Sequence, residues 1–125
     1  MRALLIGLFG LAGTLARYGL QGGVQRLSGS TFPYGTLAVN VVGSFVVGFV
    51  ATLTLERVVV SQDLRAAILI GFCGGFTTYS AFSQETFTFL QDGAWGLGAA
   101  YAAFTVIGCL CACLLGQGIA RWLVA

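Results

Sequence analysis

The 125-residue sequence contains no histidine and no lysine, only four acidic residues and a single proline. Without histidine, a carboxylate pair or a nucleophile beside a base, the chain does not look like an enzyme. Charged residues make up 8% of the sequence, against roughly one quarter in soluble domains. Six arginines give a formal net charge of +2, which is too small and too scattered to indicate nucleic-acid binding.

Hydrophobic residues, by contrast, make up 58% of the chain. Four stretches carry little or no charge, and each is long enough to cross a hydrocarbon core of about 30 Å as a helix. The sequence therefore predicts an all-α integral membrane protein, a single transmembrane domain over residues 1–125 embedded in a lipid bilayer. The four spans are expected at about residues 3–24, 34–55, 66–90 and 93–120.

Four cysteines lie inside the apolar stretches, namely Cys73, Cys109, Cys111 and Cys113. On a helix, Cys109 and Cys113 share a face while Cys111 points away, and this spacing does not make a tetrahedral metal cage. We therefore interpret the cysteines as small packing residues, and no disulfide framework is implied.

A polar segment interrupts the third stretch. Gly71, Gly74 and Gly75 precede the run Thr77-Thr78-Tyr79-Ser80. Irregular backbone persists in a membrane only where protein covers it or where it lines a cavity. We therefore expect a helix broken by these glycines near Gly74–Thr78, with a permeation or binding site beside the break. Carbonyls freed by such a break are candidates for coordinating a cation.

Polar side chains recur at helical spacing in the spans on either side of that segment. The rows are Thr36, Asn40 and Ser44 in the second span, and Tyr101, Thr105 and Cys109 in the fourth. Such rows either join helices or line a path for a solute. For Asn40 we favour a functional role, because a mid-span amide is costly to bury; for the other residues both interpretations stay open. Tyr79 and Phe82 share one face of the third span, and aromatic rings offer electropositive edges to anions.

The arginines are nearly balanced between the two ends of a four-span bundle. Arg2, Arg57, Arg65 and Arg121 are expected on one side, with Arg17 and Arg26 toward the other. This bias weakly favours cytoplasmic termini and permits insertion in either orientation. Arg17 either reaches the membrane interface or attracts an anion into a vestibule. The role of Glu85 is not readable from its position.

Three segments in order carry a family resemblance. The first segment is Gly10-Leu-Ala-Gly13-Thr-Leu-Ala-Arg17-Tyr18. The second is Gly35-Thr-Leu-Ala-Val-Asn40-Val-Val-Gly43-Ser44-Phe45, and the third is Gly71-Phe-Cys-Gly-Gly-Phe-Thr-Thr-Tyr-Ser80-Ala-Phe82-Ser. Together they resemble the CrcB/Fluc family of fluoride channels over the whole chain. The resemblance implies passive fluoride export across the inner (plasma) membrane, which relieves fluoride toxicity. It also implies an antiparallel, dual-topology homodimer with two pores, although some relatives pair with a paralogous subunit.

The resemblance also implies roles for individual residues. Asn40 would donate to fluoride, Tyr79 and Phe82 would occupy the phenylalanine-box positions, and the fourth-span row would form a polar track with Glu85 near the pore. The carbonyls of Gly74 and Thr77 would hold a structural sodium ion at the dimer centre. The full set of candidate pore residues is Asn40, Tyr79, Phe82, Ser80, Thr36, Ser44, Tyr101, Thr105, Cys109, Arg17 and Glu85.

This sequence departs from the family pattern at several positions. Tyr79 stands where phenylalanine is usual, Cys109 where a hydroxyl is usual, and Ala81 and Phe76 where threonine and leucine are common. The main alternative function is a small multidrug-resistance-type proton-coupled exporter, which needs a deep acidic residue, usually in the first span. The first span carries Arg17 instead. A subunit with a purely structural role is the other alternative.

Overall fold

All regular structure in the computed structural model, which describes residues 1–56 and 60–125, is helical. Three long helices are continuous: α1 (Arg2–Ser28), α2 (Tyr34–Glu56) and α6 (Trp95–Val124). The third span is a succession of α3 (Gln62–Ala66), the π-helix η1 (Ala67–Cys73), α4 (Gly74–Phe76) and α5 (Tyr79–Gln91). Counting Gln62–Gln91 as one, four helices are long and apolar enough to cross a membrane. The predicted all-α membrane fold with four spans is therefore confirmed.

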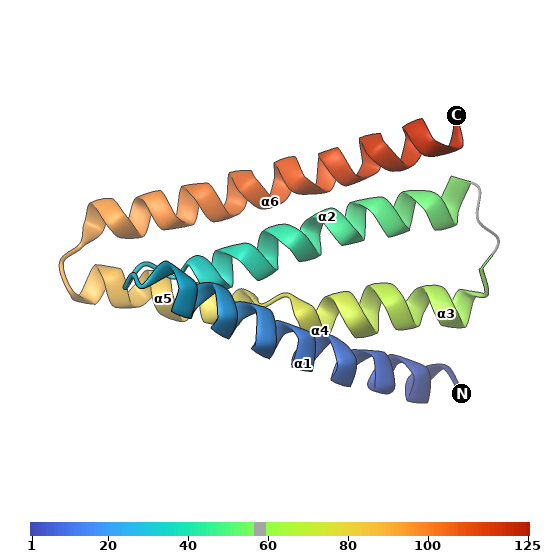
Figure 1. Ribbon diagram of the computed structural model, residues 1–125, viewed down its shortest axis with the longest axis horizontal. Helices are drawn as coiled ribbons and strands as arrows, with labels where there is room; N and C mark the ends of the chain where they lie inside the picture. Colours follow the sequence, from blue (N-terminus) through green and yellow to red (C-terminus); the bar gives the residue numbers. More distant parts are fainter. Residues whose placement is uncertain (57–59) are drawn as a thin grey trace.

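The four spans lie side by side as a bundle (Figure 1). Both chain termini and the start of α3 lie at one end, and the α1–α2 and α5–α6 connections lie at the other. α2 packs most extensively against α6, whereas α1 packs mainly against η1 and α4. The bundle thus consists of two tightly packed pairs of spans, which are joined mainly by α1 packing against α2 and by α5 packing against α6.

Small residues set the close approach of α2 and α6. A methyl group added at Gly116 would come within 2.9 Å of the backbone nitrogen of Phe49, and one at Gly48 would collide with the carbonyl of Cys113. Backbones approach this closely in membrane bundles only where side chains are absent or small. The small residues of α6 at this contact therefore form a packing surface against α2.

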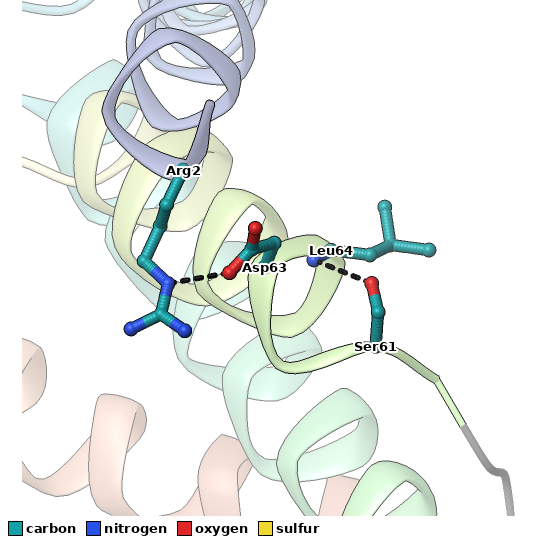
Figure 2. Close-up of polar contacts among 4 residues, drawn as sticks. All are labelled: Arg2, Ser61, Asp63 and Leu64. Carbon is teal, nitrogen blue, oxygen red and sulfur yellow. Dashed lines mark hydrogen bonds and ion pairs between the residues drawn. The ribbon is translucent and has the colours of Figure 1, made fainter.

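Ion pairs join the spans at the end that carries the termini. Figure 2 shows Arg2 reaching from the start of α1 to Asp63 in α3, with 2.6 Å between Arg2 Nε and Asp63 Oδ1. In the same view, Ser61 Oγ accepts a hydrogen bond from Leu64 N at 3.1 Å and so caps the start of α3. Arg121 and Glu56 make a second pair at 3.3 Å between α6 and α2. Arg57, which the sequence places at this end, lies outside the described residues.

The third span leaves the helical conformation at Thr77 and Thr78. Thr77 has φ −89° and ψ 159°, and Thr78 has φ −148° and ψ 115°. The predicted break near Gly74–Thr78 is confirmed, but the expectation that the glycines produce it is wrong, because Gly71, Gly74 and Gly75 are all helical. The absent side chain of Gly75 serves packing instead: a methyl group there would lie 2.5 Å from the carbonyl oxygen of Gly10 in α1.

Candidate functional site

The break in the third span is held by a side chain from α2. Asn40 Oδ1 accepts a hydrogen bond from Thr78 N at 2.8 Å, and Asn40 Nδ2 donates to Thr78 O at 3.0 Å. Thr78 Oγ1 in turn accepts from Ala81 N at 3.2 Å, which caps the first turn of α5. Both backbone groups that Thr78 withdraws from the helix are therefore satisfied by one amide.

Asn40 retains hydrogen-bonding capacity beyond this contact. A carboxamide carries two N–H donors, and the bond to Thr78 uses one of them. The residue is buried, with 8% of its surface exposed, and it lines a cavity. Asn40 is thus both a support for the break and a donor beside a space that a small ligand can enter.

That cavity has a volume of about 460 Å³ and lies between α2, the break, α5 and α6. Of the candidate pore residues, the structure brings Asn40, Ser44, Tyr79, Phe82, Thr105 and Cys109 to its wall. The remaining wall residues were not among the candidates: Val47, Thr77, Thr78, Val106, Leu110 and Cys113. Hydroxyl, amide and thiol groups from three spans therefore face one space together with two aromatic rings.

Thr105 contributes an unusual group to this wall. The residue is only 5% exposed, and its Oγ1 is buried with no hydrogen-bond partner among the described residues. Burying a hydroxyl without a partner costs about 1–3 kcal/mol. Such groups are rare in folded proteins. Thr105 Oγ1 therefore has hydrogen-bonding capacity that the described residues leave unused, although the atom itself is buried beneath the cavity wall.

A second polar cluster gathers around Glu85. Thr36 Oγ1 donates to Glu85 Oε1 at 2.7 Å, and the Tyr101 hydroxyl donates to Glu85 Oε2 at 2.6 Å. Gln21 Nε2 of α1 donates to Thr36 Oγ1 at 3.0 Å. Thr36, Tyr101 and Glu85 therefore bind one another and are not among the residues that line the cavity. Gln21 was not among the candidates. It could have been found by the signal that singled out Asn40, because both are side-chain amides within an apolar span.

Aromatic contacts connect the cavity to this cluster. The rings of Tyr79 and Phe82 lie 5.5 Å apart between centroids, and those of Phe82 and Tyr101 lie 5.4 Å apart. Phe82 is buried at 9% exposure, whereas Tyr79 is 79% exposed. Phe82 thus lies between Tyr79 and Tyr101, whose hydroxyl reaches Glu85.

The other candidates lie around the break, and of these only Thr77 reaches the cavity wall. Arg17 Nε donates to the carbonyl of Gly75 at 3.0 Å, which places its charge against α4. Ser80 is exposed, with its hydroxyl 3.3 Å from Thr78 Oγ1. Gly74 is exposed and Thr77 is half-buried, and they stand at opposite ends of the short turn α4. In the part of the chain that the structure describes, no group of three or more acidic, histidine or cysteine side chains is placed to hold a metal.

Comparison with known proteins places the chain among relatives along nearly its whole length. The family described as "CrcB-like protein, Camphor Resistance (CrcB)" matches residues 4–117. A protein of Sorangium cellulosum named "Fluoride-specific ion channel FluC" is 48% identical over 120 residues, which cover 96% of this chain and 94% of the relative. A protein of the same name from Geobacter sulfurreducens is 47% identical over 113 residues, or 90% of this chain and 88% of the relative. A third protein of that name, from Geotalea uraniireducens, is 46% identical over 118 residues, which cover 94% of this chain and 95% of the relative. The chain therefore belongs to the CrcB family.

Proposed function

We propose that this protein is a fluoride-selective passive channel that releases fluoride across the membrane and so relieves fluoride toxicity. Relatives that cover nearly the whole chain are named fluoride-specific ion channels. The observation in the structure that carries the proposal is the cavity beside the break, where uncharged donors from α2 and α6 face the rings of α5.

The chemistry of that wall suits fluoride. Because fluoride is small and strongly hydrated, it leaves water only where donors replace its hydration shell in turn. The second N–H of Asn40 is such a donor, and Thr105, whose buried hydroxyl has no partner among the described residues, lines the same cavity. Ser44 lines the same wall, and the positive edge of an aromatic ring adds to the attraction. Neutral donors attract the ion without the strong trapping that a fixed cation produces, and this allows passage.

A second copy of the chain in the opposite orientation completes the proposed channel. Tyr79 lines the cavity, yet its side chain is exposed on this chain. The surface of a second copy would cover this ring. We expect an antiparallel homodimer; pairing with a paralogous subunit is the other arrangement. The inner (plasma) membrane is the proposed location, because export across that membrane removes fluoride from the cytoplasm.

The structural sodium ion is part of the same proposal. Carbonyl oxygens suit hard cations, Gly74 is exposed, and the N–H of Thr78, four residues on, bonds Asn40 rather than the Gly74 carbonyl. The carbonyls of Gly74 and Thr77 would hold the ion together with the same groups of the second copy. The carbonyl of Gly75 is already engaged by Arg17. When bound, sodium would supply a positive charge that neutralises the carbonyl dipoles where the two copies meet.

The proton-coupled exporter has no support in the structure. Its chemistry needs an acidic residue deep in the membrane, usually in the first span. In α1, Arg17 is the charged residue beside the break. Glu85, in α5, is held by two donors.

Flux from liposomes tests the proposal. Purified protein is reconstituted into vesicles loaded with the potassium salts of fluoride and chloride, a potassium ionophore carries the compensating charge, and ion-selective electrodes follow the release of each anion. We expect fluoride to leave and chloride to stay, with protein-free vesicles as the control. Equal release of both ions would refute selectivity, and retention of fluoride would refute the channel. Phe82→Ile is expected to slow fluoride release while the protein stays assembled, and a reporter on the C-terminus is expected to register both sides of the membrane.

A further inference from the structure

Two of the four thiols face the cavity together. Cys109 and Cys113 lie one turn apart on α6, and both line the cavity wall. Cys111 instead lies in a separate apolar groove on the outer surface of α6, with Trp122, and Cys73 is buried at 2% exposure. The chain thus presents a matched pair of thiols to the cavity, and the other two cysteines have different surroundings.

The spacing of the pair suits one ion between two sulfur atoms. Residues four apart on a helix have β-carbons about 5–6 Å apart, so both sulfurs reach an ion placed between them. Zinc requires four ligands in a tetrahedron, and the described residues offer no third acidic, histidine or cysteine side chain to this pair. The pair therefore suits a soft metal ion that is satisfied by two thiolates in a line.

Charge selects a divalent ion. Two thiolates and a divalent cation form a neutral complex, whereas a monovalent cation leaves one negative charge in an apolar setting, where charge is costly. We propose that Cys109 and Cys113 form a two-thiolate site for a soft divalent ion such as Hg²⁺. Each S–H bond breaks and its proton goes to solvent, each sulfur donates an electron pair to the metal, and no oxidation state changes. Gln117 Nε2 lies 3.9 Å from Cys113 Sγ, so it is placed to donate to that thiolate.

Occupation of this site would place a metal ion in the wall of the cavity. This consequence rests on the proposed function, because it matters for flux only if fluoride passes through the cavity. The binding itself depends only on the two sulfurs.

The decisive experiment measures binding. The intact purified protein is equilibrated with HgCl₂, dialysed against a monothiol that removes mercury held by a single sulfur, and analysed for metal content. We expect one mercury per chain, with an intact mass equal to the chain plus mercury minus two protons. Cys109→Ser and Cys113→Ser are each expected to weaken binding by about 100-fold, because the second contact is then lost. Cys111→Ser is the matched control and is expected to retain the metal. Loss in the control, or retention in both test variants, would overturn the site.

A flux measurement then tests the consequence. Each variant is compared with its own fluoride release before metal is added. After Hg²⁺ treatment and removal of singly held mercury with the same monothiol, release is expected to stop through Cys111→Ser and to be unchanged through Cys109→Ser. Continued fluoride release with mercury bound would show that an occupied site does not block the cavity. A protein that released no fluoride at all would refute the channel function but not the site, which the dialysis decides separately.

Discussion

Asn40 and Thr78 form a two-way hydrogen-bonded pair, in which one side-chain amide satisfies both the N–H and the carbonyl of a single residue, at 2.8 and 3.0 Å. Thr78 lies where the third span stops being helical, and both partners are buried. An interrupted helix in lipid needs an alternative partner for every freed backbone group. Asn40 is that partner, so the residue supports the shape of the cavity as well as lining it.

Replacement of Asn40 is therefore expected to lower stability. Asn40→Leu leaves the N–H and the carbonyl of Thr78 buried without partners, at a cost of about 1–3 kcal/mol each. Denaturant unfolding in detergent, followed by circular dichroism, measures the loss. Ser44→Ala, one turn along the same face of α2, is the control and is expected to change stability much less. Equal effects of the two substitutions would show that Asn40 does not support the break.

The carboxylate of Glu85 is expected to couple Thr36 to Tyr101. Thr36→Val and Tyr101→Phe each remove one donor to Glu85, and a hydrogen bond to a charged group contributes about 1.5–3 kcal/mol. Because both donors serve the same carboxylate, the double variant is expected to deviate from the sum of the single variants by about 0.5–3 kcal/mol. Unfolding free energies of the four proteins measure this difference.

Thr54→Val provides the comparison for that cycle. Among the described residues, the Thr54 hydroxyl bonds only carbonyls of its own helix, so the substitution is expected to add independently to Tyr101→Phe. Strict additivity of Thr36→Val and Tyr101→Phe would contradict the arrangement around Glu85.

Two glycines of α6 are expected to respond oppositely to alanine. Gly116→Ala places a methyl group against the backbone of Phe45 and Phe49 and is expected to destabilise the protein by about 1–3 kcal/mol. Gly118→Ala meets no atom of residues 1–56 or 60–125 within 4 Å and is expected to stabilise the helix by up to about 1 kcal/mol. Thermal unfolding of both variants decides the matter. A stabilising Gly116→Ala would mean that α2 and α6 are farther apart than described.

The contacts in Figure 2 are expected to differ in their response to salt. Arg2→Gln removes an ion pair whose side chains are 55% and 37% exposed, and such pairs contribute about 0–1 kcal/mol. High salt is expected to abolish this effect, because screening weakens exposed pairs. Ser61→Ala removes the cap of α3 and is expected to cost about 0.5–2 kcal/mol at any salt concentration. Unfolding at low and high salt measures both, and a salt-independent effect of Arg2→Gln would contradict the ion pair.

The candidate site was predictable in part, since polar groups in apolar spans are conspicuous. Asn40, Ser44, Thr105 and Cys109 were singled out by that signal, and the structure places all four on one cavity wall. Thr36 and Tyr101 belong to the same two rows but turn to Glu85. A row of residues at fixed spacing does not show which neighbouring helix each member faces. Gln21 of α1 also joins the cluster around Glu85, through Thr36, and this contact depends on how α1 packs against α2.

What the sequence by itself determined is the membrane fold: four stretches of sufficient length with little or no charge, and a polar interruption in the third. These features indicate spanning helices, because a helix satisfies its own backbone hydrogen bonds within lipid. The tertiary structure alone decided that the break falls at Thr77 and Thr78 and that Asn40 closes it. A hydrogen bond between residues 38 positions apart depends on how α2 and the third span pack, and side-chain packing of that kind is not encoded in local spacing.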